Sequence, residues 1–255
     1  MRDANQIFDL SGKVALVTGG SRGMGKEMIL AFARAGADVV IASRKLDSCE
    51  ELAEQVRKDT GRRALPVACN VSDWTQNEKL AETALAHYGR VDVLVNNAGM
   101  SPLYKHVADV TEALWDKVIG VNMKGPFRLT SVLGKHMFER GSGSIIFVSS
   151  TGSLHPTGGI IPYAGSKAAV NAMTVGFAHH FGPKVRVNCI IPGPFLTDIS
   201  KAWDIPAFEA RAKQNIFLQR GGQAEEIVGA ALYFASDASS FTTGAHLEVA
   251  GGGIG

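Results

Sequence analysis

The chain has 255 residues, of which 45% are hydrophobic, and a formal net charge of +2 at pH 7. This length suits a single α/β domain, and so large an apolar fraction excludes an intrinsically disordered chain. The charge is nearly balanced and Lys and Arg are scattered, which argues against a nucleic-acid or acidic membrane partner.

Short apolar runs alternate with longer amphipathic segments along the chain. The runs are rich in β-branched residues and predict seven buried strands, at Val14–Thr18, Val39–Ala42, Ala64–Cys69, Val91–Val95, Ile145–Ser149, Val185–Ile191 and Leu247–Val249. The amphipathic segments predict helices at 24–35, 46–59, 74–88, 111–139, 162–181 and 223–236. This alternation predicts a Rossmann-type α/β fold, a doubly wound, mainly parallel seven-stranded sheet with helices on both faces, as a single domain over residues 1–255.

The longest irregular stretch runs from Pro192 to about Gly222 and follows the sixth predicted strand. It contains apolar residues such as Phe195 and Trp203. Ligands bind beyond the strand ends of such sheets, and long connections there are often functional. We therefore expect a substrate lid at about residues 194–220, the alternative being an insertion that only packs.

The cysteines and the apolar runs bear on the compartment. Cys49, Cys69 and Cys189 are odd in number and lack metal-type spacing, so we expect free thiols in a reducing compartment and no metal site. Residues 1–10 lack the apolar core of a signal peptide, and no run approaches the roughly 20 residues that span a bilayer. A cytoplasmic protein is expected.

The first predicted strand leads through a glycine-rich turn directly into a helix, with the sequence Thr18-Gly19-Gly20-Ser21-Arg22-Gly23-Met24-Gly25. Glycines allow close approach of a pyrophosphate, and the helix N-terminus offers free N–H groups and a positive dipole end. The spacing departs from G-x-G-x-x-G, since Met28 occupies the last glycine position. The order of strand, turn and helix still predicts a dinucleotide site.

The end of the second strand bears on the choice of nicotinamide cofactor. NAD enzymes typically place an acidic residue there, about 20 residues beyond the glycine turn, to bind the ribose 2′-hydroxyl. Here the chain reads Ser43-Arg44-Lys45, and Arg44 and Arg22 are suited to pair with a 2′-phosphate. NADP(H) is therefore favoured and NAD(H) is possible. The alternative is that Arg44 and Lys45 only open a solvated helix turn.

Tyr163 and Lys167 lie four residues apart at the start of a predicted helix and therefore share one face. An ammonium ~4 Å from the phenol is worth roughly 4 kcal/mol at an effective dielectric of 20, enough to lower the tyrosine pKa by at most about three units. The pair is predicted to transfer a proton. The alternative is a Tyr packed beside a solvated Lys.

Other polar residues follow the ends of predicted strands. Ser150 is placed to hydrogen-bond a substrate oxygen, and Asn96-Asn97-Ala98-Gly99 forms a polar turn beside the cofactor. Asn122 interrupts an apolar helix, where it would either orient a relay water or hydrogen-bond neighbouring structure. Pro192-Gly193-Pro194-Phe195-Leu196-Thr197 offers backbone groups and a hydroxyl to a carboxamide.

With these motifs in this order, the chain resembles a short-chain dehydrogenase/reductase of the compact, single-domain branch, from Leu10 to Gly252. The family's glycine pattern T-G-x-x-x-G-x-G is met by Thr18, Gly19, Gly23 and Gly25, its N-N-A-G by Asn96 to Gly99, its catalytic tetrad by Asn122, Ser150, Tyr163 and Lys167, and its P-G-x-x-x-T by Pro192, Gly193 and Thr197. The resemblance implies hydride transfer between a nicotinamide cofactor and a carbonyl or alcohol.

The resemblance also implies roles for individual residues. Tyr163 would be the general acid in reduction or the base in oxidation, and Lys167 would lower its pKa and hold the ribose hydroxyls. Ser150 would polarise the carbonyl, and Asn122 would hold the relay water. The cofactor would contact Gly19, Ser21, Arg22, Gly23, Met24, Gly25, Ser43, Arg44, Asn70, Val71, Asn96, Ala98, Gly99, Tyr163, Lys167, Pro192, Gly193 and Thr197.

Two positions depart from the family pattern. Asn70 stands where the family usually has an Asp in contact with adenine, and its amide can still accept from the adenine amino group. Ala250 replaces the Asp of V-D-G-G near a subunit contact of the family, so we expect it to alter assembly more than catalysis.

The leading hypothesis is an NADPH-dependent reductase of ketones or 3-oxoacyl thioesters, acting on a small molecule as a homotetramer or homodimer. The alternative is an NAD-dependent alcohol, polyol or sugar dehydrogenase. A catalytically silent cofactor-binding scaffold is the rival of another class; it predicts a damaged tetrad, whereas all four side chains are present.

Overall fold

The structure is a computed structural model that describes residues 4–197, 200 and 203–253. Within them, seven strands form one parallel sheet in the order β3-β2-β1-β4-β5-β6-β9. The strand bounds are β1 Val14–Thr18, β2 Asp38–Ser43, β3 Ala64–Ala68, β4 Val93–Asn96, β5 Gly143–Val148, β6 Val185–Pro192 and β9 His246–Val249. The seven predicted strands are confirmed, and only their ends shift, by one or two residues.

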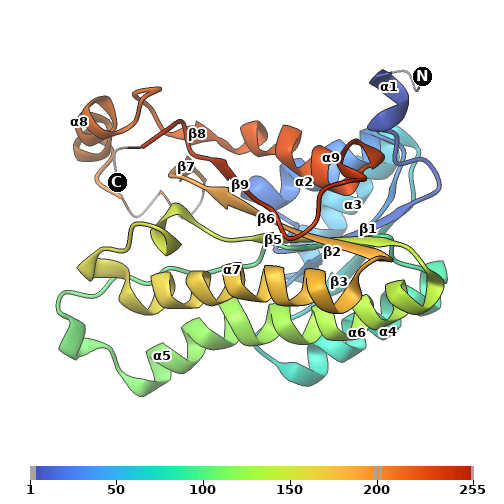
Figure 1. Cartoon of the computed structure of the whole chain (residues 1–255), viewed down its shortest axis with the longest axis horizontal. Coiled ribbons are helices and arrows are strands. Elements are labelled where there is room, and N and C mark those ends of the chain that lie inside the picture. Colours follow the sequence, from blue (N-terminus) through green and yellow to red (C-terminus); the bar gives the residue numbers. More distant parts are fainter. Residues whose placement is uncertain (1–3, 198–199, 201–202, 254–255) are drawn as a thin grey trace.

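Helices cover both faces of this sheet (Figure 1). One face carries α2 Gly23–Arg34, α3 Leu46–Thr60 and α9 Val228–Ala235, and the other carries α4 Trp74–Tyr88, α5 Glu112–Ile119, α6 Gly125–Arg140 and α7 Ile161–Phe181. A short helix, α1 Ala4–Ile7, precedes the first strand. The predicted doubly wound fold is therefore confirmed.

The core consists of two apolar layers, one on each face of the sheet. Phe32 and Ile41 belong to the layer beneath α2 and α9, whereas Leu129 and Phe147 belong to the layer beneath α6 and α7. Each of these side chains is completely buried. Burial of one such side chain stabilises the fold by about 1.5–3 kcal/mol, which is why the strands are apolar on both faces.

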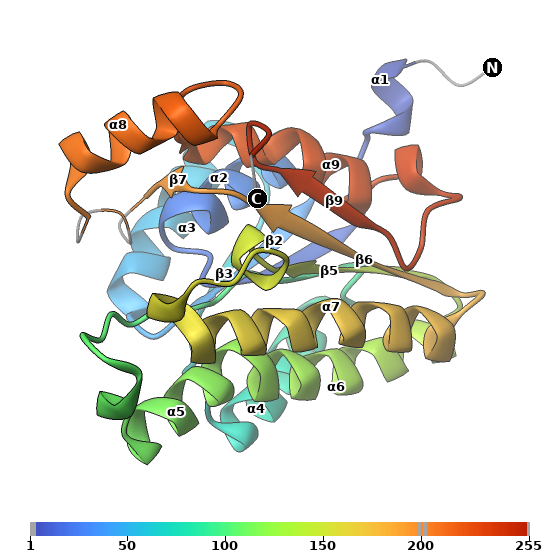
Figure 2. The same cartoon turned by 60° about the vertical axis from the view of Figure 1, so that its left-hand side comes forward.

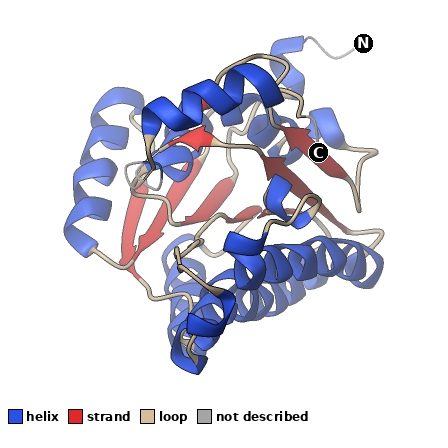
Figure 3. Cartoon of the chain, turned by 90° about the vertical axis from the view of Figure 1, so that its left-hand side faces the viewer, coloured by secondary structure: helices blue, strands red, loops and turns tan. Residues whose placement is uncertain are grey.

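The strand order reverses between β1 and β4. From β1 the chain builds outward to β3 and then returns to the other side of β1 to form β4. In such sheets ligands bind beyond the carboxyl ends of the strands at this reversal. Figure 3 views the molecule from the side on which the strands end, with helices above and below the sheet.

The predicted helix at 111–139 is interrupted. The α5 helix ends at Ile119, a π-helical turn spans Gly120–Lys124, and α6 begins at Gly125. At this turn the helix crosses the loop after β3 closely, since a Cβ on Gly125 would lie 1.9 Å from the Val71 carbonyl oxygen. Hydrophobic periodicity carries no information about such a backbone contact, so the sequence pattern predicts one continuous helix. The helix predicted at 223–236 likewise begins as a 3₁₀ turn, Ala224–Ile227, before α9.

The irregular stretch after β6 contains regular structure. Strand β7 Phe195–Leu196 pairs in parallel with β8 Gly222–Gln223, and α8 Ile205–Asn215 lies between them in the chain. In Figures 1 and 2, α8 stands beyond the ends toward which β6 and β9 point. Residues 198, 199, 201 and 202 of the expected lid lie outside the described residues.

Candidate active site

The turn between β1 and α2 is built by glycines. Gly19 and Gly23 have φ of 63° and 52°, a region that L side chains rarely adopt. A Cβ on Gly25 would lie 2.2 Å from the Gly19 carbonyl oxygen, so only glycine fits there. Arg22 is the N-cap residue of α2, and its side chain makes no capping hydrogen bond with the first amides of the helix. A glycine-rich turn that allows close approach, at a helix N-terminus without a side-chain cap, fits a pyrophosphate.

The polar turn after β4 braces this glycine turn. Asn97 Nδ2 donates to the carbonyl oxygens of Thr18 (2.9 Å) and Gly19 (3.2 Å), while the amides of Asn97 and Ala98 donate to Thr18 Oγ1. Asn96 is turned the other way, and its Nδ2 donates to Thr130 Oγ1 on α6. Asn97 and Thr18 therefore hold the candidate cofactor turn in place, and both are absent from the predicted contacts although they belong to the N-N-A-G and T-G motifs.

The end of β2 lies against the same turn. Ser21 Oγ donates to Ser43 Oγ at 3.0 Å, and Ser43 Oγ donates to the Lys45 carbonyl oxygen. This bond brings Arg22 and Arg44, the residues that follow the two serines, to one edge of the crevice, and both are exposed. Arg22 and Arg44 therefore follow two residues that are in contact, next to the turn at which the cofactor is predicted.

Asn70 lies after β3, where the sequence predicts adenine contact. Its Oδ1 already accepts hydrogen bonds from the Ser72 amide (3.3 Å) and the Ser72 hydroxyl (2.9 Å). The next residue, Val71, is buried, and its carbonyl oxygen accepts from Asn77 Nδ2. The amide oxygen of Asn70 thus has less free capacity than the sequence-based expectation assumes.

The motif at the end of β6 approaches the glycine turn. A Cβ on Gly23 would lie 3.4 Å from Thr197 Cβ, so Thr197 stands next to the glycine turn. A Cβ on Gly193 would lie 2.8 Å from the Cα of Ala250, which places Ala250 directly against the Pro192-Gly193 turn. The departure at Ala250 therefore lies beside the cofactor crevice as well as near the chain end.

Ser150, Tyr163 and Lys167 come together at the carboxyl end of β5. Ser150 follows that strand, and Tyr163 and Lys167 lie in the first two turns of α7. A Cβ on Gly152 would lie 3.4 Å from Ser150 Oγ and 3.6 Å from Tyr163 Cε1, so the two side chains meet across this glycine. Lys167 Nζ lies 5.9 Å from the centre of the Tyr163 ring.

Burial shifts the pKa values of both members of this pair. Burial raises the pKa of Tyr163, and a hydrogen bond with Ser150 opposes that rise. Burial lowers the pKa of Lys167 to about 8, and the ammonium donates to the Val148 carbonyl oxygen at 2.7 Å. Burial is therefore the main influence on the pKa of Tyr163 in this structure, and a lowering of that pKa by Lys167 stays a prediction.

Asn122 sits inside the π-helical turn and is completely buried. Its Oδ1 accepts from the Met100 amide at 2.9 Å, and its Nδ2 donates to the Met100 carbonyl oxygen (2.9 Å) and to Ser166 Oγ (3.0 Å). Ser166 Oγ in turn donates to the Tyr163 carbonyl oxygen at 2.6 Å. Asn122 thus bonds to neighbouring structure, and its role in orienting a relay water stays a prediction. Ser166, a small buried residue before Lys167, is a further member of this network.

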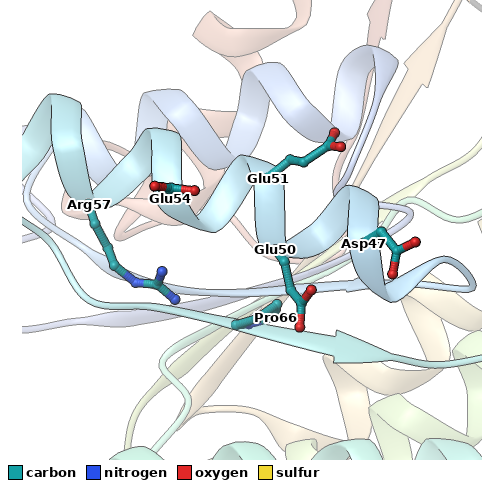
Figure 4. A pocket seen from close by; sticks show the side chains of 6 residues that line it. All are labelled: Asp47, Glu50, Glu51, Glu54, Arg57 and Pro66. Carbon is teal, nitrogen blue, oxygen red and sulfur yellow. The ribbon is translucent and has the colours of Figure 1, made fainter.

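A separate groove runs along α3 and the edge strand β3 (Figure 4). It is lined by Asp47, Glu50, Glu51, Glu54, Arg57 and Pro66. Four carboxylates against one guanidinium make it repellent to phosphate groups. The glycine turn between β1 and α2, not this groove, is therefore the candidate dinucleotide site.

The glycine turn at the strand reversal and the Ser-Tyr-Lys set at the end of β5 together define a nicotinamide-dependent oxidoreductase. The family model described as Enoyl-(Acyl carrier protein) reductase matches residues 19–253. Dehydrogenase/reductase SDR family member 4 of Oryctolagus cuniculus is 35% identical over 245 residues, 95% of this chain and 94% of that protein.

Two further comparisons cover the same length. The 3-oxoacyl-(acyl-carrier-protein) reductase FabG of Thermotoga maritima is 37% identical over 244 residues, 95% of this chain and 98% of that protein. A solved structure of 7α-hydroxysteroid dehydrogenase with NADH and 7-oxo glycochenodeoxycholic acid has a TM-score of 0.94 at 32% identity and covers 100% of this chain and 98% of that one. The chain therefore belongs to the short-chain dehydrogenase/reductase family.

Proposed function

We propose that the protein reduces a ketone or a 3-oxoacyl thioester with NADPH, and that Tyr163 is its general acid. The observation that carries this proposal is the meeting of Ser150 and Tyr163 at the end of β5, beside the glycine turn of β1. A phenol whose pKa is raised by burial is protonated at neutral pH, the form that must donate a proton to a carbonyl oxygen as it becomes an alcohol.

The other residues of the set have distinct tasks in this proposal. The nicotinamide, when bound, supplies the hydride. Ser150 donates a hydrogen bond to the substrate carbonyl, and Lys167 holds positive charge near the phenol and binds the ribose hydroxyls. Asn122 orients the relay water through groups other than its Nδ2, because both Nδ2 hydrogens are taken by Met100 and Ser166.

NADP(H) is the preferred cofactor in this proposal, with NAD(H) as the alternative. Arg22 and Arg44 supply two positive charges at the edge where Ser21 bonds Ser43, and the end of β2 carries no acid. A doubly charged 2′-phosphate is stabilised by such a pair, whereas a ribose hydroxyl gains little from it. The 7α-hydroxysteroid dehydrogenase structure contains NADH, so membership of the family does not by itself favour NADP(H). The preference for NADP(H) in this proposal rests on Arg22 and Arg44.

The segment at 194–220 is the substrate lid of this proposal. The pairing of β7 with β8 joins the two ends of this segment, and Phe208 of α8 is buried within it. The rings of Trp203 and Phe208 lie 5.1 Å apart. Such a small apolar contact suits a segment that opens and closes at modest cost.

A homotetramer or homodimer is also part of the proposal. Trp74, Phe127 and Val175, on α4, α6 and α7, are 37%, 43% and 52% exposed, although all are large apolar residues. Figure 1 shows α6 and α7 side by side on the outer surface of their layer. Apolar groups gathered on neighbouring helices are typical of an interface between subunits. Analytical ultracentrifugation checks this, and a monomer at micromolar concentration would contradict it.

The location proposed is the cytoplasm. Cys49, Cys69 and Cys189 are all free thiols, and all three are buried. Free thiols persist in reducing compartments. No helix among the described residues is long and apolar enough to cross a bilayer.

The function is tested with a panel of carbonyl compounds and NADPH absorbance. The panel contains acetoacetyl-coenzyme A, a diketone, a steroid ketone and a keto sugar, with the corresponding alcohols and polyols assayed in reverse with NAD. We expect turnover of a ketone or thioester with NADPH. Turnover of polyols with NAD alone would favour the alternative, and no turnover of any compound would favour a catalytically silent protein.

A further inference from the structure

Tyr104 joins two loops that are far apart in the sequence. It lies after β4, and its hydroxyl donates to the Gly158 carbonyl oxygen at 2.8 Å and accepts from the Ile161 amide at 2.8 Å. These partners stand 54 and 57 residues further along the chain. The phenol is half-buried. Both hydrogen-bonding capacities of one side chain are thus used to connect the loop after β4 with the start of α7.

The start of α7 lacks a cap of its own. The N-cap residue is Ile160, whose side chain has no acceptor, and the second helical residue is Pro162, which has no N–H. The first amide that requires a partner is therefore that of Ile161, and Tyr104 supplies it. An N-cap function that Ser, Thr, Asp or Asn normally performs locally is here performed by a tyrosine from another loop.

This first turn carries Tyr163. A Cβ on Gly152 would lie 2.9 Å from Ile160 Cδ1 and 3.6 Å from Tyr163 Cε1, so the N-cap residue and the phenol ring pack around the same glycine. A shift of the turn would therefore move the phenol relative to Ser150. Misplacement of a reacting group by about 1 Å lowers turnover by as much as 10²-fold.

The loop that carries Tyr104 is itself anchored near the cofactor crevice. Four residues earlier, the backbone of Met100 makes both of its hydrogen bonds with the side chain of Asn122. Tyr104 therefore belongs to a loop that Asn122 holds in place, and the hydrogen bond from Ile161 to its hydroxyl fixes the start of α7 relative to that loop.

We propose that Tyr104 is a positioning residue for the reaction: its hydroxyl holds the first turn of α7 so that the Tyr163 phenol faces Ser150. The inference rests on the proposed role of Tyr163 as proton donor. Tyr104 itself touches neither member of that pair in the hydrogen bonds described, so it acts through the helix.

The test compares Tyr104→Phe with Tyr88→Phe. Both changes remove one phenol hydroxyl, but Tyr88 Oη donates to the Val39 carbonyl oxygen at 3.3 Å, far from the crevice along β2. Hydrogen exchange of the peptide covering Ile161 to Tyr163 is measured first, since it needs no substrate. Exchange is expected to rise in Tyr104→Phe and to stay at the wild-type rate in Tyr88→Phe.

Kinetics follow, with NADPH and the panel carbonyl that the wild-type protein turns over fastest. Tyr104→Phe is expected to lower kcat about tenfold, to leave the KM for NADPH unchanged, and to enlarge the solvent deuterium isotope effect on kcat, because proton donation becomes slower. A purely structural role would lower the melting temperature without changing the isotope effect. Unchanged exchange at Ile161, or a kcat equal to that of Tyr88→Phe, would overturn the proposal.

Tyr163→Phe separates this inference from the proposed function. If Tyr163→Phe retains full turnover, the role of Tyr163 fails and the inference fails with it. If Tyr163→Phe is inactive while Tyr104→Phe matches the wild type in both exchange and kcat, the function stands and the inference alone is overturned.

Discussion

The ammonium nitrogen of Lys167 lies 5.9 Å from the centre of the Tyr163 ring and donates to the carbonyl oxygen of Val148 at 2.7 Å. Lys167 is buried and Tyr163 is half-buried. Burial opposes the charged form of each, which raises the pKa of Tyr163 and lowers that of Lys167. In the protein without cofactor, the Tyr163 phenol is therefore protonated at neutral pH and lies near Lys167, whose pKa is about 8. A protonated phenol is the state from which reduction starts.

The first prediction concerns the ionisation of Tyr163. Because burial raises its pKa above the ordinary value, we expect Tyr163 to ionise at higher pH than a free tyrosine and to stay protonated from pH 7 to 9 in the cofactor-free protein. Ultraviolet absorbance at the tyrosinate band is recorded against pH for the wild type and for Tyr163→Phe, and the difference isolates the residue. A step in this difference between pH 7 and 9 would show instead that Lys167 lowers the phenol pKa without cofactor.

The second prediction concerns stability against pH. Lys167 has a pKa of about 8 when folded and 10.5 as the reference value, so above pH 8 the unfolded chain binds more protons than the native protein. Stability linked to this group is therefore lowest below pH 8 and rises as pH increases toward 10.5. Between pH 8 and 9 the wild type should gain about 1 kcal/mol relative to Lys167→Met.

Urea denaturation at several pH values measures this gain. Lys167→Met also leaves the Val148 carbonyl oxygen without its donor, but that loss is the same at every pH and does not alter the slope. Parallel curves of unfolding free energy for the two proteins would mean that Lys167 keeps its ordinary pKa in the folded state.

Much of the fold and of the site was predictable because its signals are local. Buried parallel strands must be apolar on both faces, so runs such as Val14–Thr18 identify themselves. The glycine turn is equally local, since the conformations of Gly19 and Gly23 and the contact at Gly25 exclude other residues. The order of these motifs then places Ser150, Tyr163 and Lys167 at strand and helix ends that meet.

Hydrogen-bond partners were not predictable, because they depend on contacts between distant segments. Nothing near Lys167 in the sequence indicates that its partner is a backbone carbonyl 19 residues earlier. Asn96 and Asn97 are adjacent and alike, yet one bonds α6 and the other the glycine turn. The π-helical turn and the capping of Ile161 by Tyr104 likewise arise only when loops pack together.

The third prediction concerns cofactor choice. Arg44→Asp places an acid where NAD enzymes carry one and removes a charge that pairs with a 2′-phosphate. We expect kcat/KM with NADPH to fall by roughly tenfold or more relative to that with NADH, since a hydrogen bond to a charged group contributes about 1.5–3 kcal/mol and each tenfold corresponds to about 1.4 kcal/mol. Steady-state kinetics with both cofactors measure the ratio.

A matched control separates local pairing from net charge. Lys58→Asp makes the same change of charge on the exposed last turn of α3 and should leave the ratio unchanged. If Arg44→Asp shifts the ratio no more than Lys58→Asp does, Arg44 takes no part in cofactor selection.

The fourth prediction concerns Asn122. Replacement by Ala leaves the amide and carbonyl of Met100 and the hydroxyl of Ser166 without this partner in a buried turn. Unsatisfied buried groups cost about 1–3 kcal/mol each, and partial relaxation of the turn leads us to expect a loss of roughly 2–4 kcal/mol in the free energy of unfolding. Thr83→Ala, which removes one exposed hydroxyl bond to the Lys79 carbonyl, should change it by no more than about 0.5 kcal/mol. Urea denaturation of both variants measures the difference. A loss below that of Thr83→Ala would mean that water replaces Asn122 in the turn, and the braced segment leading to Tyr104 would then have to be held by other contacts.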